Sequence, residues 1–190
     1  MFNNSNFSEE AGLIQGCLKG DRLAQRHLYE SYSGKFLAIC LRYLKDREHA
    51  EDVMIEGFMK IFDKLPQFQG KGSFEGWMKR IMVTQALMKL RSNKHLMMEV
   101  HVEQDSSFPD NQHYETNHLE AEELMTLVKS LPVGYRTVFN LYAIEGYSHK
   151  EIAELLGITE STSKSQLNRA RNVLKNQIIA QQLNERRING

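Results

Sequence analysis

Apolar residues recur every three or four positions along most of the chain, a spacing that is typical of α-helices with one buried face. In the first half, this pattern predicts helices over residues 8–19, 21–44, 46–65 and 73–91. In the second half, it predicts helices over residues 119–130, 132–144, 148–156 and 159–182. Pro66 and the glycines of the loop 66–72 end the third of these helices. We therefore expect an all-α protein.

The helical pattern is interrupted once, over residues 93–118, which follow no period and are rich in Ser, Asp and Asn around Pro109. Segments of this composition are commonly linkers at the protein surface. We expect a small helical domain over residues 1–95, a flexible acidic linker over 96–118 and a second small helical domain over 119–190.

The second predicted domain contains the features of a helix-turn-helix, a motif that docks on duplex DNA. Ser148 is followed three residues later by Glu151, which is the arrangement of a capping box at the start of a helix. Gly157 stands where a residue with positive φ would end that short helix. Thr159 is then placed to cap the next helix.

The second helix of this motif combines an apolar stripe with a polar, positively charged surface. The stripe consists of residues spaced by three or four, namely Leu167, Ala170, Leu174 and Ile178. Short polar and basic side chains elsewhere on the helix suit the major groove, because they can reach base edges and hold phosphates. An ordinary helical hairpin with a solvated face is the alternative. The candidate DNA-contacting residues are Ser161, Lys164, Ser165, Gln166, Asn168, Arg169 and Arg171.

The formal net charge of the chain is 0, but the charges are unevenly distributed. Residues 69–95 hold six basic residues and one acidic residue, whereas residues 96–126 hold eight acidic residues and neither Lys nor Arg. Residues 129–190 hold nine basic and five acidic residues. Local potential, not net charge, attracts phosphates, so this pattern is compatible with two nucleic-acid-binding regions.

The first basic region also contains aromatic residues. Phe74 and Trp77 lie among the cations Lys71, Lys79 and Arg80. Aromatic faces close to cations can bind unstacked bases of single-stranded DNA. The same two aromatic residues also fit a helix–core pattern, so the sequence leaves both interpretations open.

Two long segments of the chain resemble regions of bacterial RNA polymerase sigma factors. The string LKDREHAEDVMIEGFMKIFDKL, followed by FQGKGSFEGWMKRI, is similar to their second conserved region. The string LPVGYRTVFNLYAIEGYSHKEIAELLGITESTSKSQLNRAR is similar to their fourth. The resemblance covers about residues 20–92 and 119–180, in the order found in the small extracytoplasmic-function group.

That resemblance implies a protein that binds core RNA polymerase, directs it to promoters and helps to open them, without being an enzyme or needing a cofactor. It implies that Asp52, Glu56 and Phe58 contact the clamp helices of the β′ subunit, and that helices near Tyr135 to Tyr142 contact the β flap. An anti-sigma factor is a further expected partner. The acidic linker would be either a solvated tether or a segment that threads the nucleic-acid channels of the polymerase.

The resemblance also implies two separate contacts with promoter DNA. The helix-turn-helix would read the minus-35 element as a duplex. The loop 66–73 and the start of the next helix would capture unstacked bases of the minus-ten element, at a cost on the order of a few kcal/mol for unstacking. The candidate residues for the minus-ten contact are Lys71, Ser73, Phe74, Trp77, Lys79, Arg80 and Thr84.

Four positions depart from the pattern of the family. Thr84 stands where Asn is common and Met88 where Asp is common. Thr84 is expected near the melted strand, so the base preference of the family at that point cannot be transferred to this chain. Ser163 replaces a usual apolar residue, so we expect slightly looser packing of the recognition helix. Gln166 replaces a common Arg and removes a cation, so the minus-35 specificity of the family cannot be transferred to this chain.

The remaining features exclude several classes of protein. Cys17 and Cys40 lie in apolar helical patterns and are predicted to be buried thiols. The sequence lacks a closed set of metal ligands and a nucleophile–base pair, so we expect neither a metal site nor catalytic residues. It also lacks a signal peptide and a long apolar span, which predicts a cytoplasmic protein. A stand-alone helix-turn-helix regulator and a helical interaction protein without DNA binding remain as alternatives.

Overall fold

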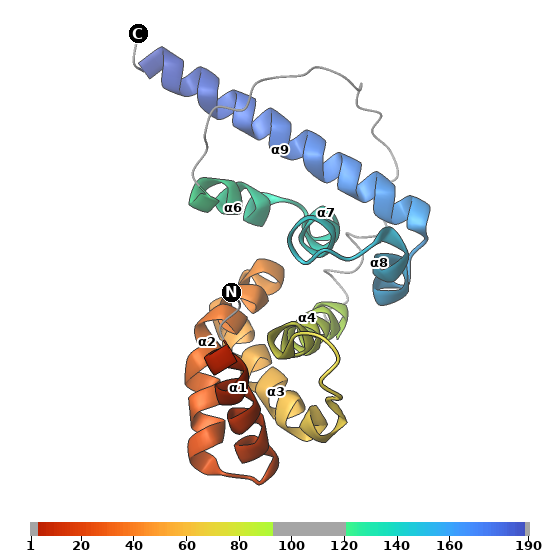
Figure 1. The fold of residues 1–190 in the computed structure, drawn as a ribbon. Helices are drawn as coiled ribbons and strands as arrows, with labels where there is room; N and C mark the ends of the chain where they lie inside the picture. The colour runs from red at the N-terminus through yellow and green to blue at the C-terminus, as the bar shows by residue number, and fades with distance from the viewer. Residues whose placement is uncertain (1–3, 93–120, 189–190) are drawn as a thin grey trace. The chain divides into compact units, whose positions relative to one another are not determined.

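The computed structural model describes residues 4–92 and 121–188 of the chain, and every element in these two ranges is helical (Figure 1). The all-α prediction is therefore confirmed for the described residues. The chain divides into two compact units, unit 1 (Met1–Leu90) and unit 2 (Arg91–Gly190). The predicted linker, residues 96–118, lies outside the described residues.

Over the described residues 4–92, the first part of the chain forms four α-helices and one short 3-10 turn. They are α1 (Asn4–Leu18), α2 (Arg22–Leu44), α3 (Arg47–Lys64), the turn η1 (Leu65–Gln67) and α4 (Phe74–Ser92). Aspartates begin two of the helices: the Asp21 carboxylate accepts from the Leu23 amide at 2.8 Å, and that of Asp46 accepts from the His49 amide at 2.9 Å. Such caps satisfy amide groups that have no partner within the helix.

The core of unit 1 forms where α2, α3 and α4 meet. Leu28, Phe36, Ile61, Met78 and Met82 are almost completely inaccessible to solvent. The end of the Met82 side chain, from α4, lies directly against Gly57 of α3, so a Cβ added at Gly57 would overlap it. On the surface, the Lys35 ammonium lies 3.1 Å from the Glu75 carboxylate and links α2 to α4.

Both cysteines belong to unit 1, and the prediction of buried thiols is confirmed. Cys17 and Cys40 are free and buried. Burial raises the pKa of the Cys40 thiol to about 12, and it also raises the pKa of Cys17, with a smaller contribution from the nearby Asp21 carboxylate. Neutral thiols of this kind behave as small apolar groups.

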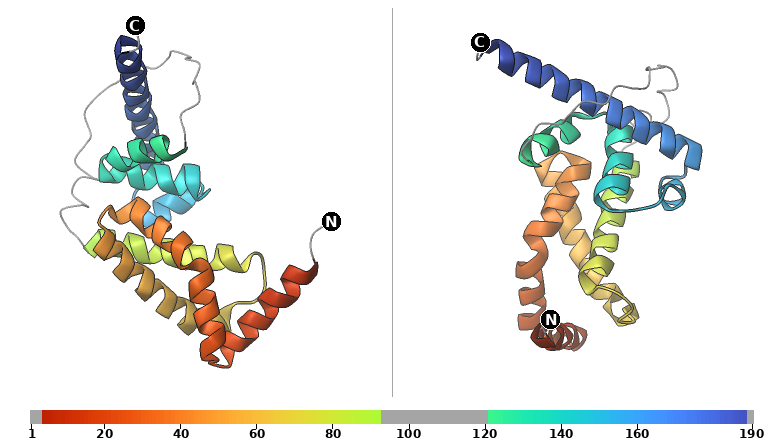
Figure 2. Two further views of the ribbon diagram at one scale, coloured as in Figure 1. Left: turned by 90° about the vertical axis from the view of Figure 1, so that its left-hand side faces the viewer. Right: turned by 45° about the horizontal axis from the view of Figure 1, so that its top comes forward.

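Unit 2 contains α6 (Ala121–Ser130), α7 (Val133–Phe139), the π-helical turn η2 (Asn140–Ile144), α8 (His149–Leu156) and α9 (Glu160–Ile188). The long helix α9 runs past α6, α7 and α8, and it is continuous in both views of Figure 2. Residues of α9 and of the preceding helices form a buried core, which consists of Leu127, Val128, Leu131, Tyr135, Ala170 and Leu174. The Gln177 amide also donates to the Ser130 hydroxyl at 3.1 Å, which ties α9 to α6.

The observed helices differ from the predicted ones at several ends. The first helix begins at Asn4, so Ser8 is not its cap, and the last extends to Ile188 instead of ending near residue 182. The predicted helix 132–144 is an α-helix up to Phe139 that continues as the π-helical turn. None of the described helices is long and apolar enough to cross a membrane. In the same described ranges, no group of three or more His, Cys, Asp or Glu residues is placed to hold a metal ion.

Candidate nucleic-acid interface

The helix-turn-helix of unit 2 has the geometry that the sequence predicts. The Ser148 amide donates to the Glu151 carboxylate at 2.8 Å, and the Glu151 amide donates to the Ser148 hydroxyl at 3.3 Å, so both halves of the capping box are present. Gly157 ends α8 with φ 68° and ψ 35°, and its amide donates to the Ala153 carbonyl at 2.9 Å. The left-handed conformation turns the chain sharply toward α9.

A second cap begins α9. The Thr162 amide donates to the Thr159 hydroxyl at 3.0 Å, as expected for Thr159 at the N-cap. The next turns present an exposed polar surface, which we call the α9 face: Ser161, Lys164, Ser165, Asn168 and Arg171. Arg169 is half-buried beside it. The α9 face thus carries five of the seven predicted minus-35 candidates on its surface.

Gln166 does not lie on the α9 face, which corrects its assignment as an exposed DNA contact. It is 5% exposed and follows the helical spacing of the buried stripe, four residues before Ala170. Its amide group therefore points toward the interior of unit 2. The hydrogen-bonding capacity of a glutamine side chain suits a base contact, but the angle of Gln166 around α9 places it on the buried side.

Ser163 makes a polar contact that the sequence did not indicate. It is 0% exposed, and its hydroxyl lies 2.9 Å from Nδ1 of His149, the first residue of α8. The His149 ring stacks on Tyr142 with centroids 4.5 Å apart, and the Arg171 guanidinium lies 5.8 Å from the centre of the Tyr142 ring. The unusual Ser163 was the only signal of this cluster in the sequence.

The candidate minus-ten residues surround the start of α4 in unit 1. Gly70 and Gly72 have φ of 68° and 89°, and they flank the exposed Lys71. The Ser73 hydroxyl accepts from the Gly76 amide at 3.2 Å and caps α4. A loop of this shape needs glycine because other residues rarely adopt positive φ. It holds Lys71 in solvent immediately before the helix.

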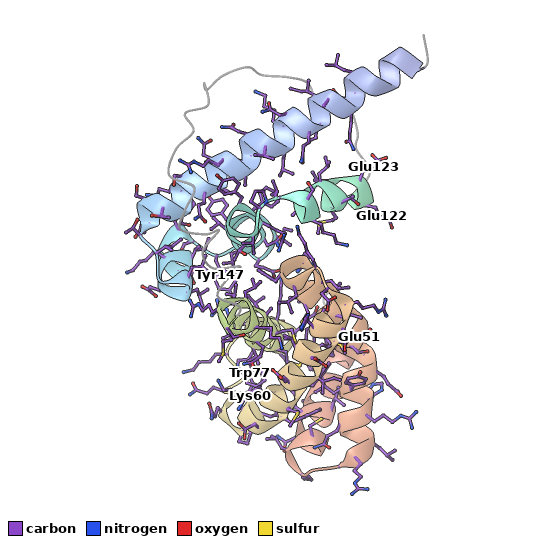
Figure 3. All side chains as sticks on the ribbon, turned by 180° about the vertical axis from the view of Figure 1, so that it is seen from behind. Glu51, Lys60, Trp77, Glu122, Glu123 and Tyr147 are labelled. Carbon is purple, nitrogen blue, oxygen red and sulfur yellow. The ribbon has the colours of Figure 1, made fainter. Side chains whose placement is uncertain are left out.

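The aromatic residues of this region form a cluster that belongs largely to the core. Phe68 lies 5.1 Å from Phe74 and 5.3 Å from Trp77, measured between ring centroids. Phe74 is only 1% exposed, whereas Trp77 is half-buried on α4 (Figure 3). Phe74 therefore does not offer its ring to a base, which corrects its assignment as a DNA contact. Trp77 keeps part of its ring surface accessible.

The polar candidates on α4 fall on two sides of the helix. Arg80 and Thr84 are exposed, and the Thr84 hydroxyl donates to the Arg80 carbonyl at 2.8 Å. Residues 73, 77, 80 and 84 follow helical spacing and share one side of α4. Lys79 is half-buried and lies outside this spacing. The structure thus brings together Ser73, Trp77, Arg80 and Thr84, with Lys71 just before them.

The candidate polymerase-binding residues of α3 also divide into surface and core. Asp52 and Glu56 are exposed. Phe58 is 3% exposed, and its ring packs against Tyr29 and Phe36 at centroid distances of 4.8 and 5.4 Å, which corrects its assignment as a surface contact.

Two large apolar side chains on the exposed side of α3 were missed. Ile55 is 50% exposed and Met59 is 66% exposed, at helical spacing from Asp52 and Glu56. The sequence indicates them only as two apolar residues that lie outside the buried stripe of the helix. The polar Lys60, further along α3, is also exposed (Figure 3).

Comparisons with known proteins agree with this geometry. Residues 28–96 match the family description Sigma-70 region 2, and residues 121–174 match Sigma-70, region 4. The chain is 27% identical to the ECF RNA polymerase sigma-E factor of Haemophilus influenzae, over 89% of this chain and 95% of that protein. It is also 27% identical to the ECF RNA polymerase sigma factor SigW of Bacillus subtilis, over 87% of this chain and 94% of that protein.

Two solved structures share the fold. CnrH, in a complex with the cytosolic domain of CnrY, matches with a TM-score of 0.50 and 20% identity over 88% of this chain and 96% of that one. The sigma factor RpoE of Bartonella quintana, in a complex with the anti-sigma factor NepR, matches with a TM-score of 0.50 and 19% identity over 82% of this chain and 96% of that one.

A region 2 unit followed by a region 4 unit with a helix-turn-helix is the arrangement of RNA polymerase sigma factors of the sigma-70 family. The chain belongs to the sigma-70 family, in its extracytoplasmic-function group. It is a non-catalytic polymerase subunit that directs promoter-specific initiation of transcription, which excludes a stand-alone regulator.

Proposed function

We propose that the α9 face binds the minus-35 element of the promoter as duplex DNA. The observation that carries this proposal is the exposed polar and basic surface on α9, directly after a capped helix and a left-handed glycine turn. Asn168, on this surface, and Arg169, half-buried beside it, would approach base edges. Lys164 and Arg171, at its flank, would hold phosphates.

Unit 1 would hold the minus-ten element through the side of α4 that carries Ser73, Trp77, Arg80 and Thr84. Lys71 would contact the phosphate backbone from the loop, because it is exposed between two glycines. The accessible part of Trp77 would stack on an unpaired base. Phe68 and Phe74 would support this ring from the core, since both pack against it.

The exposed side of α3 would bind the clamp helices of the polymerase β′ subunit. Asp52 and Glu56 supply charge there, and Ile55 and Met59 supply exposed apolar surface, a combination that is typical of protein interfaces. In unit 2, Tyr142 is exposed but Tyr135 is buried, so Tyr142 is the better candidate for a contact with the β flap.

The division of labour would follow the predicted domains, with residues 1–95 for core polymerase and the minus-ten element and 119–190 for the minus-35 element. An anti-sigma factor is a further proposed partner, because two structures with this fold are complexes in which the sigma factor or its relative is held by another protein. The chain would act in the cytoplasm, where its polymerase and promoters are.

The test separates DNA binding from polymerase binding. Arg169→Ala should weaken promoter binding by the holoenzyme about tenfold, since a good side-chain contact to a base is worth roughly 1–3 kcal/mol, and should leave core binding unchanged. Gln181→Ala, an exposed position further along α9, is the matched control and should change neither. Promoter affinity can be measured by fluorescence anisotropy with promoter fragments recovered by the wild-type holoenzyme. Affinity for core polymerase can be measured by fluorescence anisotropy of the labelled chain. Equal loss of both affinities in Arg169→Ala would contradict the placement of the DNA contact.

A further inference from the structure

The side chains of Tyr142, His149, Ser163 and Arg171 form a connected group, which we call the histidine cluster. They come from three separate elements: the π-helical turn η2, the first position of α8 and the helix α9. Their contacts are a hydrogen bond of 2.9 Å, a ring stack of 4.5 Å and a cation–ring distance of 5.8 Å. The cluster therefore connects both helices of the helix-turn-helix to the turn that precedes them.

The first contact fixes α9 against α8. A buried hydroxyl group costs free energy when it lacks a hydrogen-bond partner, and Ser163 is 0% exposed. Its hydroxyl is paired with Nδ1 of His149, which is on the other helix of the motif. Because a hydrogen bond is directional, this pair specifies the rotation of α9 more narrowly than an apolar contact would.

The other two contacts, the ring stack and the cation–ring contact, orient Arg171, a candidate for binding a phosphate of the DNA. The rings of Tyr142 and His149 are nearly parallel, with an interplanar angle of 21°. The Arg171 guanidinium lies over the Tyr142 ring, where the negative face of the ring attracts a cation. Arg171 is exposed, so this contact restricts a side chain that would otherwise sample many rotamers. An arginine held in one direction loses less entropy when it binds a phosphate.

We propose that His149 is a positioning residue for promoter recognition: through Ser163 and Tyr142 it fixes the orientation of α9 and of Arg171 for their contact with minus-35 DNA. The proposal rests on the DNA-binding role proposed above for the α9 face. His149 itself is half-buried and contacts Ser163 and Tyr142, neither of which belongs to the α9 face.

The charges around His149 provide a signature that a purely structural side chain would lack. Burial lowers the pKa of His149 below its ordinary value, and Lys164 and Arg171 lower it further, whereas Glu160 acts in the opposite direction. The imidazole is therefore neutral at pH 7.5. Phosphates bound beside Lys164 and Arg171 would stabilise the imidazolium, so the DNA complex would take up a proton that the free protein does not hold. Affinity should therefore rise as the pH falls toward 5.5.

The experiment compares three variants of the full chain in the holoenzyme, on promoter fragments recovered by the wild-type holoenzyme. His149→Ala should weaken promoter binding at pH 7.5 about three- to tenfold, because it leaves the Ser163 hydroxyl unpaired and removes the stacked ring. Ser163→Ala should weaken it about two- to threefold, because the stack remains. The double variant His149→Phe with Ser163→Ala keeps a ring and leaves no unpaired hydroxyl, so it should bind like Ser163→Ala.

The pH profile then distinguishes positioning from general destabilisation. Dissociation constants at pH 5.5, 6.5 and 7.5 should vary less with pH in both His149 variants than in the wild type. Wild-type affinity in His149→Ala, or pH profiles that are the same in all proteins, would overturn the proposal. Arg169→Ala is measured in parallel: if it binds normally, the DNA-binding role of α9 fails, whereas normal binding by His149→Ala alone rejects only the role of the histidine.

Discussion

The helices α4 and α9 both carry candidate DNA contacts, but the side chains beneath those contacts differ. The buried side of α4 is made of large apolar residues, among them Phe74, Met78 and Met82. The buried side of α9 mixes the polar Ser163 and Gln166 with Leu167, Ala170 and Leu174. In α4, the aromatic Phe74, whose ring could stack on a base, instead supports the surface from the core. In α9, Gln166 is buried, and the buried Ser163 joins α9 to α8 through His149.

In both units, a residue whose side chain has the chemistry to contact a base lies in the interior instead. Phe74 has the chemistry to stack on a base, yet 1% exposure assigns it to the core. Gln166 has the chemistry to read a base, yet 5% exposure assigns it to the interior of unit 2. The exposed cations, Lys71 and Arg80 on one side and Lys164 and Arg171 on the other, are what the two surfaces share.

The largest effect should come from removing the aromatic support of α4. Phe74→Ala should lower the free energy of unfolding of unit 1 by about 3–5 kcal/mol, because it leaves a cavity in a packed core. Chemical denaturation followed by Trp77 fluorescence measures this change. The exposed Thr84→Ala is the control and should change stability little. A Phe74→Ala protein with wild-type stability and defective promoter opening would instead assign the ring to DNA.

A smaller effect is expected at the turn between α8 and α9. Gly157→Ala should lower the stability of unit 2 by about 1–2 kcal/mol, because φ of 68° disfavours any residue with a Cβ. A Cβ there meets no atom within 4 Å, so conformation and not crowding would cause the loss.

Gly34→Ala is the matched control for this turn. A Cβ at Gly34 also meets no atom within 4 Å, but this residue lies within α2 at ordinary φ. The alanine should therefore raise the stability of unit 1 by about 0.5–1 kcal/mol. Thermal unfolding followed by circular dichroism measures both variants. Two shifts of the same sign would contradict the conformational explanation.

The loop before α4 should contribute a modest electrostatic effect. Lys71→Ala should slow promoter opening. It should also reduce the slope of log affinity against log salt by about the amount that corresponds to one phosphate contact. Opening can be followed by permanganate reactivity of unpaired thymines at several salt concentrations. Lys19→Ala, at an exposed lysine between α1 and α2, is a charge-matched control and should leave the slope unchanged. Identical slopes for Lys71→Ala and the wild type would remove this lysine from the DNA contact.

The smallest effect concerns the caps of the two units, which differ in their response to pH. The backbone amide of His49 lowers the pKa of the Asp46 carboxyl below its ordinary value. Its stabilising contribution is present above the ordinary carboxyl pKa and is lost as the pH falls through the lowered value. Thr159, which caps α9, has no charge to lose.

Asp46→Ser should therefore make unit 1 less sensitive to acid between pH 5 and pH 2, as measured by urea denaturation across that range. Thr159→Ser should leave the pH dependence of unit 2 unaltered. An unchanged acid profile in Asp46→Ser would mean that the cap does not titrate as described.

Local features of the fold were predictable because they depend on residues close in sequence. Ser148 and Gly157 flank one short helix that contains Glu151, and their spacing alone predicted the capping box and the turn. Pro66 and the glycines after it likewise marked the end of α3 and the loop before α4. Helical period alone also identified the all-α class.

The features of the site that were not predictable from the sequence depend on which sides of two neighbouring helices face each other. Phe58 became a core residue because α2 supplies Phe36 and Tyr29 opposite it. The pairing of His149 with Ser163 joins residues fourteen positions apart and requires the angle between α8 and α9. The π-helical turn, which carries Tyr142, has no distinct sequence period in this chain.

The burial of both cysteines has a practical consequence for measuring how this protein moves on its polymerase. Cys17 and Cys40 are inaccessible, and their raised pKa values keep them protonated at the pH used for maleimide coupling. A single cysteine introduced at an exposed position, such as Gln181→Cys near the end of α9, would take up a fluorophore selectively. The native thiols could stay in place, and a second dye on the promoter would then report distance during initiation in real time.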